Sequence, residues 1–368
     1  MRRNSFYMSA VAVCLLVLAC PFTSGTAAPS KRESGRESGR GSGRQSLADE
    51  GRRGSGGGSD SPAVTAEQSL AAEATVTLLA CVESGGVVVR AWDRKEVRAR
   101  SNDASRIELR RADATVEPNP ATRIEVLVAK DQAEPARPGL CSNSGNLELD
   151  VPRGSTIHIK GNTGDISITG VASVRARTLS GDIELQRITK STEASSANGT
   201  IIMRNSSGRV RLETISSEIV ASDLGTDEAG DEFFAKSVSG EIMLAKLAHT
   251  HVEATSSNSS IDFTGALVEG GLYTFKSHSG SVRLSLPPDS AFQLNAKVHH
   301  SGEIITEFPI RQVPVMLSQD PRTTAPVGGA LLQDGRLTGV TGKGDRRAAT
   351  LILASFSGTV HLQQQVAQ

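Results

Sequence analysis

The stretch Ser180-Gly181-Asp182-Ile183-Glu184-Leu185 decides the fold, because close variants of it recur along most of the chain. Each variant has a small pair such as Ser-Gly, then a polar residue, then an aliphatic residue that begins an alternation. The glycine, or the serine that replaces it, lies at Gly145, Gly164, Gly181, Gly199, Ser217, Gly240, Ser259, Gly280, Gly302 and Gly358. Most of these positions are about 20 residues apart, and a repeat of that length is typical of a solenoid.

Aliphatic residues alternate with polar residues on both sides of most of these positions. Ile183 and Leu185 follow Gly181 in this way, and Val174 and Ala176 precede it. A period of two predicts strands with one buried face. Each repeat therefore supplies two short strands joined by a tight turn, and neither strand can bury its apolar face without a neighbour.

Two all-β architectures satisfy this pattern. The repeats can stack as coils of a single-chain parallel β-helix, or they can pair as hairpins in an antiparallel β-sandwich or barrel. Stacking is favoured because equivalent positions match in chemistry from copy to copy. Arg175, Glu193 and Arg211 share one outward position with alternating charge, and stacked coils would place them in a favourable ladder.

The β-helix domain is expected to occupy residues 63–368. Ser84-Gly85-Gly86-Val87 fits the motif and predicts an opening layer, and residues 63–73 are expected to form a short helix that closes the end. Two insertions interrupt the repeats, an acidic one at residues 223–232 and a long one at residues 309–345.

The first residues have the features of an export signal. Arg2 and Arg3 precede an apolar run that is too short to span a membrane, and small residues follow it. We expect residues 1–27 to be a signal peptide, which would send the chain to the periplasm, the cell surface or the medium without a transmembrane helix. An alternative is a lipoprotein anchored at Cys20, because residues 17–20 resemble a lipobox.

Residues 28–62 repeat the triplet Ser-Gly-Arg and have almost no apolar residues, so this stretch is expected to be a disordered linker.

The whole chain has 40 basic and 40 acidic residues and only 3% aromatic residues. A neutral chain with so few rings is unsuited to nucleic-acid binding, which depends on excess positive charge and base stacking.

Two cysteines, Cys81 and Cys141, lie outside the predicted signal region. Each falls four residues before a motif glycine, at Gly85 and Gly145. If those two turns are neighbours in space, the cysteines come within reach of a disulfide bond, which an oxidising compartment would preserve.

The histidines suggest two arrangements that could bind a transition metal. His249 and His251 alternate, so both would point to one face of an extended segment, and His278 and His300 could stack in adjacent coils. No third ligand is evident for either pair. We therefore assign no metal and no cofactor.

Carboxylates offer two further candidates for chemistry. The acidic insertion could hold calcium, although its spacing is not that of an EF-hand loop. Carboxylates also recur directly after the turns, and paired carboxylates can hydrolyse glycans. These residues are Asp165, Asp182, Glu218, Glu241 and Glu303. A polar residue at this position can equally well face water, so no catalytic residue is assigned.

The repeated Ser-Gly-Asp-Ile-Glu-Leu unit resembles a family of exported bacterial proteins, domain of unknown function 4097. Residues 82–97 are similar to the opening of that family, and residues 339–344, followed by Ser357-Gly358-Thr359-Val360, to its closing repeat. The resemblance covers about residues 74–363. It implies a right-handed, single-chain parallel β-helix with a provisional adhesin label and no established catalytic residues.

Three functions follow as hypotheses. The leading one is a non-enzymatic, adhesin-like or envelope scaffold protein that binds a repetitive ligand, such as a glycan or another cell-surface component. The second is a polysaccharide-active enzyme on the same scaffold, which requires a groove with clustered acids and bases. The third is an envelope-signalling partner of another protein, which predicts an exposed apolar patch within residues 308–332.

Overall fold

A computed structural model describes residues 66–101, 106–113, 119–129, 141–143, 146–299, 302–311, 335–342 and 348–365. These residues belong to one of two units of the chain, the one that begins at Asp60. They form strands and turns, and no helix among them is long and apolar enough to cross a membrane. The predicted signal peptide, the linker and Cys20 lie outside the described residues.

Each coil contributes one strand to each of two parallel sheets. In the coil around Gly181, β10 (Ser173–Thr178) enters the turn and β11 (Ile183–Gln186) leaves it. Strand β10 pairs in parallel with β8 (Thr156–Thr163) and β12 (Ser191–Ser196). Strand β11 pairs in the same way with strands of the neighbouring coils. We call the two sheets the pre-turn sheet and the post-turn sheet.

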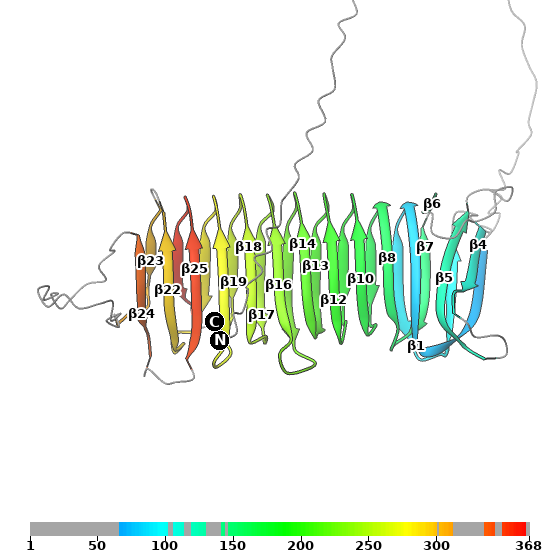
Figure 1. Cartoon of the computed structure of the whole chain (residues 1–368), viewed down its shortest axis with the longest axis horizontal. Helices are drawn as coiled ribbons and strands as arrows, with labels where there is room; N and C mark the ends of the chain where they lie inside the picture. Colours follow the sequence, from blue (N-terminus) through cyan, green and yellow to red (C-terminus); the bar gives the residue numbers. More distant parts are fainter. Residues whose placement is uncertain are drawn as a thin grey trace, which may run out of the picture. The chain divides into compact units, whose positions relative to one another are not determined.

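The described strands stand side by side in a row (Figure 1). The pre-turn sheet contains β1 (Ala66–Ser84), β5 (Ala121–Ala129), β6 (Ser142–Asn143), β8, β10, β12, β14 (Arg209–Thr214), β16 (Glu232–Ser237), β18 (His251–Ser256), β20 (Leu272–Ser277), β22 (Phe292–Val298) and β25 (Ala349–Ser355). The post-turn sheet contains β2 (Val87–Trp92), β7 (Leu147–Pro152), β9 (Ile166–Thr169), β11, β13 (Ile201–Ser207), β15 (Ile219–Gly225), β17 (Ile242–Leu247), β19 (Ile261–Thr264), β21 (Val282–Leu286), β23 (Ile304–Thr306) and β26 (Val360–Gln364).

The prediction of a single-chain parallel β-helix is confirmed, and the antiparallel sandwich is wrong. Antiparallel pairs among the described strands occur only toward the two ends of the row. There β3 (Glu96–Ser101) pairs with β1 and β7, β4 (Arg106–Arg111) with β5, and β24 (Arg336–Val340) with β22. These strands cover coils that would otherwise expose an unpaired edge.

The inward side chains of the two sheets form one continuous core. Ile183 and Leu185 are fully buried, and so are their register partners Ile201 and Met203 in the next coil. Burial of each such side chain stabilises the fold by about 1.5–3 kcal/mol. Less buried outward residues alternate with this core along most of the strands, so the stacked coils specify one register.

A buried hydroxyl closes many of the turns, three residues before the motif glycine. Ser277 accepts a hydrogen bond from the backbone N–H of Gly280 at 2.8 Å and donates one to the carbonyl oxygen of Ser259 in the preceding coil at 3.0 Å. Ser196 and Ser355 make the same two bonds in their own turns. The hydroxyl thus satisfies a turn N–H and also links the coil to its neighbour.

The motif glycines are required where neighbouring turns approach each other. A Cβ atom at Gly199 would lie 1.7 Å from the carbonyl oxygen of Gly181, and one at Gly240 would lie 1.6 Å from that of Ser217. No side chain fits at these distances, so the spacing between coils itself selects glycine.

The order of the coils in space differs from their order in the sequence at both ends of the row. Strands β1 and β2 lie between β5–β7 and β8–β9. Strands β25 and β26 lie between β20–β21 and β22–β23. In Figure 1 the red strand β25 is accordingly not the last of the row. The last described coil of the sequence is therefore inserted one position inward.

The helix predicted for residues 63–73 is wrong for the part that the structure describes, because residues 66–73 belong to β1. Leu70 and Ser69 pair with Val97 and Arg98 of β3. Pairing with β3 outweighs the helix propensity of the alanines in this stretch. The predicted insertion at residues 309–345 includes β24, which pairs with β22.

We predict that Ser277→Ala lowers the free energy of unfolding by about 1–3 kcal/mol, because the N–H of Gly280 and the carbonyl of Ser259 both lose their bond to the hydroxyl. Urea denaturation measures the change. Ser279→Ala is the matched control, since Ser279 lies in the same turn with an exposed side chain. Equal midpoints for the two variants would contradict a structural role for the hydroxyl.

Candidate functional site

The outward side chains of the pre-turn sheet form ladders that cross successive coils. Arg175, Glu193 and Arg211 are register partners, as predicted. Glu193 forms ion pairs with Arg175 at 2.6 Å and with Arg177 at 2.5 Å. Because these side chains are partly exposed, the pairs contribute little to stability. They give this sheet an ordered, charged surface.

The third member of the predicted ladder pairs differently. Arg211 forms its ion pair with Glu213 of its own strand at 2.6 Å, and its guanidinium lies 4.3 Å from the ring centroid of Phe234 in the next coil. The hydrogen bond from Arg177, together with the charge of Arg175, holds the pKa of Glu193 below its usual range. Glu193 therefore remains a carboxylate at neutral pH.

A shallow hollow of about 370 Å³ lies over these ladders. His158, Arg175, Glu193, Arg209 and Arg211 are among the residues that line it. Burial, together with the charge of Arg175, lowers the pKa of His158, which is therefore a neutral imidazole at pH 7. The hollow offers arginine side chains and hydroxyl groups to a polar ligand. Glu193 is the single carboxylate in its lining.

Two of the carboxylates that follow the turns bind the backbone of the next coil. The Asp165 side chain accepts a hydrogen bond from the N–H of Asp182 at 2.9 Å, and the Asp182 side chain accepts one from the N–H of Thr200 at 2.7 Å. Asn146 does the same for Gly86 at 3.0 Å. These side chains extend the ladder of turn hydrogen bonds, which explains why acidic and amide residues recur there.

Glu241 is the exception, because it faces a second carboxyl group on the post-turn sheet. It shares a hydrogen bond with Asp262 of β19 and accepts another from the Ser260 hydroxyl at 2.8 Å. Burial and this hydrogen bond raise the pKa of Asp262 to about 6, while the same bonds lower the pKa of Glu241. Arg283 lies 3.4 Å from Asp262. Asp262 was not among the residues singled out from sequence, because it lies three residues after Ser259 and not directly after the turn.

The expectation that His249 and His251 point to one face is wrong. His249 is fully buried, and its Nε2 atom lies 2.8 Å from the carbonyl oxygen of Gly208. Burial lowers the pKa of this imidazole. His251 instead points outward, where its Nδ1 atom lies 3.0 Å from Glu232. The chain leaves the corner of the coil at His249 before β18 begins, so the two side chains do not follow strand alternation.

The acidic insertion is organised by its own backbone. Asp231 is buried and accepts hydrogen bonds from the N–H groups of Asp227 at 2.9 Å and Glu228 at 2.8 Å. These bonds, that of Glu228 foremost, lower the pKa of Asp231. Within the described residues, no three His, Cys, Asp or Glu side chains are grouped as metal ligands.

A cluster of exposed rings lies near one end of the row, and its members are distant from each other in the sequence. The sequence suggested that His278 could stack on His300 in an adjacent coil, but the strand next to β20, which precedes His278, is β25, and β22 lies beyond it. The ring of Phe356 stacks on His278 there, with centroids 4.6 Å apart. His300 itself lies outside the described residues.

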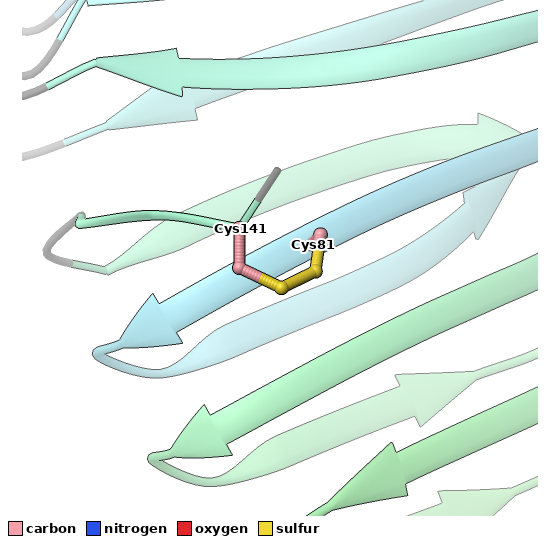
Figure 2. The surroundings of a disulfide bond; sticks show 2 residues. All are labelled: Cys81 and Cys141. Atoms are coloured by element: carbon pink, nitrogen blue, oxygen red, sulfur yellow. A yellow bond between two sulfur atoms is a disulfide. The ribbon is translucent and has the colours of Figure 1, made fainter. Parts of the chain in front are cut away.

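Cys81 and Cys141 form a disulfide bond in the structure (Figure 2). Their Cα atoms are 4.5 Å apart, although 60 positions separate them in the sequence. Cys81 lies in β1 and Cys141 directly precedes β6, and these two strands are paired. The bond therefore joins two neighbouring coils at the point where the coil order departs from the sequence order.

We predict that Cys81 and Cys141 are oxidised to each other in residues 28–368 produced under oxidising conditions, so that no free thiol is titrated after denaturation without reductant. Removal of the cross-link in Cys81→Ser/Cys141→Ser should lower the free energy of unfolding by about 2–5 kcal/mol. Thiol titration and denaturation in urea measure the two effects. Two free thiols in that protein would contradict the prediction.

We predict that Asp262→Asn makes the protein more stable at pH 7, by on the order of 1 kcal/mol, and that the gain is clearly smaller at pH 4.5. The folded state binds a proton at Asp262 more tightly than the unfolded chain does. The wild type therefore loses stability as the pH rises from about 4 to above 6, whereas an amide cannot titrate. Thermal melts at the two pH values test this.

Asp289→Asn, which removes an exposed carboxylate in a loop, is the control for that comparison. A difference between Asp262→Asn and the wild type that does not change with pH would show that the carboxyl pair does not share a proton.

A family model described as Toastrack DUF4097 matches residues 105–313, which is more than half of the chain. One solved structure, of a "putative cell adhesion protein" from Clostridium sporogenes, covers 82% of this chain and 100% of its own at 8% identity. Its TM-score is 0.23, and a similarity at that level establishes neither fold nor function. No curated protein matches the chain. The family match confirms the resemblance found in the repeats, and the chain belongs to the Toastrack DUF4097 family.

Proposed function

We propose that the protein is an exported, non-enzymatic, adhesin-like or envelope scaffold protein that binds a repetitive polymer at its surface. The observation that supports this most directly is the register of the pre-turn sheet, where outward positions recur from coil to coil at one strand spacing, about 4.8 Å. A regular array of exposed side chains suits a ligand that is itself regular, such as a glycan. The family membership and the provisional adhesin label are consistent with this role.

The alternative of a polysaccharide-active enzyme has less support. Asp165 and Asp182 already accept backbone N–H groups, so their oxygens serve the turns. Glu241 and Asp262 are hydrogen-bonded to each other, whereas the two carboxyl groups of a glycosidase lie about 5 Å or more apart on either side of the scissile bond. The proposal therefore assigns these carboxylates to the scaffold.

The alternative of an envelope-signalling partner predicted an exposed apolar patch within residues 308–332. Phe308 is buried and packs against Phe292, with ring centroids 5.3 Å apart. Residues 312–334 lie outside the described part of the chain. This alternative therefore has no specific observation in its favour.

Export is part of the proposal. The disulfide between Cys81 and Cys141 suits an oxidising compartment such as the periplasm or the cell exterior. Residues 1–27 are proposed to direct export, and residues 28–62 to tether the β-helix at a distance from its attachment. Lipidation at Cys20 is the alternative way of attachment.

The experiment is to incubate the purified protein with immobilised cell-wall and extracellular polysaccharides and to score retention and product release together. We expect retention on at least one polymer without release of shortened products. Cleavage would overturn the non-enzymatic assignment. Absence of retention on every polymer would contradict the proposed ligand class. Bovine serum albumin on the same matrices controls for non-specific adsorption.

A further inference from the structure

Three rings form a column on the surface where the last coils meet. His278, Phe356 and His299 follow β20, β25 and β22 at equivalent positions, because β25 pairs with both of the other strands. The rings of His278 and Phe356 are nearly parallel, with centroids 4.6 Å apart, and those of His299 and Phe356 are 5.7 Å apart. Both histidines are exposed, and Phe356 is 38% exposed.

Two lysines accompany the outer rings of this column. Lys276 and Lys297 each lie two residues before a histidine, and both are register partners of Ala354 in β25. The three coils thus present Lys-Ser-His, Ala-Ser-Phe and Lys-Val-His side by side. Both lysines are exposed, and neither takes part in an ion pair among the described residues.

The lysines are two strand spacings apart along the row, which is roughly 9.6 Å. Ala354 lies between them and leaves that space open, because its side chain is a single methyl group. The separation is comparable with the length of a disaccharide in an extended polysaccharide. A polymer with one anionic group on every second sugar can therefore reach both lysines at once.

The imidazoles supply the second part of the recognition. No hydrogen bond to the side chain of His278 or His299 forms among the described residues, so their ring nitrogens are available to sugar hydroxyls. His278 stacks on Phe356, and His299 contacts the same ring at a tilt of 38°. These contacts hold both imidazoles in place before a ligand arrives, which reduces the entropy lost on binding. Phe356 is partly exposed, and the exposed part of its ring adds an apolar contact for the C–H groups of a sugar.

We propose that Lys276, His278, Phe356, Lys297 and His299 form a binding site for an acidic polysaccharide that carries carboxylates on alternate sugars. This inference rests on the proposed function, since it names one site and one ligand class for the general role. The ammonium groups bind the carboxylates by charge-assisted hydrogen bonds, and the column of rings binds the intervening sugar.

The test measures the affinity of the purified protein for hyaluronate, which has a carboxylate on alternate sugars, and for neutral dextran, by titration calorimetry at low salt. We expect binding of hyaluronate and no binding of dextran. Lys276→Gln/Lys297→Gln and His278→Ala/His299→Ala should each weaken the binding on the order of tenfold. Lys95→Gln/Lys190→Gln is the matched control, because it removes the same charge at exposed positions outside the site. It should leave the affinity unchanged.

Thermal melts of all variants establish that they fold, so that a loss of affinity reports on the site. This inference would be overturned if the control pair weakened the binding of hyaluronate equally, or if the site variants kept their affinity. It would also be overturned if single-stranded DNA bound as tightly as hyaluronate. In those cases retention on another polysaccharide would still uphold the proposed function. Failure to bind hyaluronate would likewise overturn the site, and failure to bind any polymer of the wider panel would overturn both.

Discussion

Backbone hydrogen bonds between neighbouring coils hold the parallel strands about 4.8 Å apart, and this spacing constrains the rest of the molecule. It leaves no room for a Cβ atom between the turns at Gly181 and Gly199, so glycine recurs there. It brings the hydroxyl of Ser277 within reach of both Gly280 and the preceding coil. It also places Arg175 beside Glu193 on the surface. The repeated motif is the consequence of one distance that every coil must satisfy.

The same constraint explains why residues that resemble catalytic groups are part of the scaffold. A turn that stacks on another turn presents N–H groups that need an acceptor, and Asp165 and Asp182 provide it. The pair of Glu241 and Asp262 arises where two carboxylates come into register at the same surface. Burial disfavours a second charge there, and together with the hydrogen bond to Glu241 it raises the pKa of Asp262 to about 6. Stacking of coils thus accounts for the positions of Asp165, Asp182, Glu241 and Asp262.

The ends of the row impose a further requirement, because an end coil exposes an unpaired edge. Strands β3 and β24 pair in antiparallel fashion with outer coils, and the disulfide of Cys81 and Cys141 ties the inserted coil of β1 to its neighbour. At the other end, the coil of β25 is inserted between those of β20 and β22. This insertion creates the column of rings, since Phe356 comes from a segment that is distant in sequence from His278.

The sequence by itself determined the strands and the register within each repeat, and it favoured parallel stacking over an antiparallel sandwich. A period of two within a repeat of about 20 residues leaves few ways to bury Ile183 and Leu185. It also placed Cys81 and Cys141 at equivalent positions of two turns. Only the tertiary structure decided the order of the end coils, which depends on free-energy differences between alternative edge pairings that leave no local pattern. The tertiary structure also decided that residues 66–73 form part of a strand and that His249 is buried at a corner, because both depend on contacts with other segments of the chain. The partnership of Glu241 with Asp262 and the placement of Phe356 between two histidines likewise depend on contacts between coils, and no single repeat contains them.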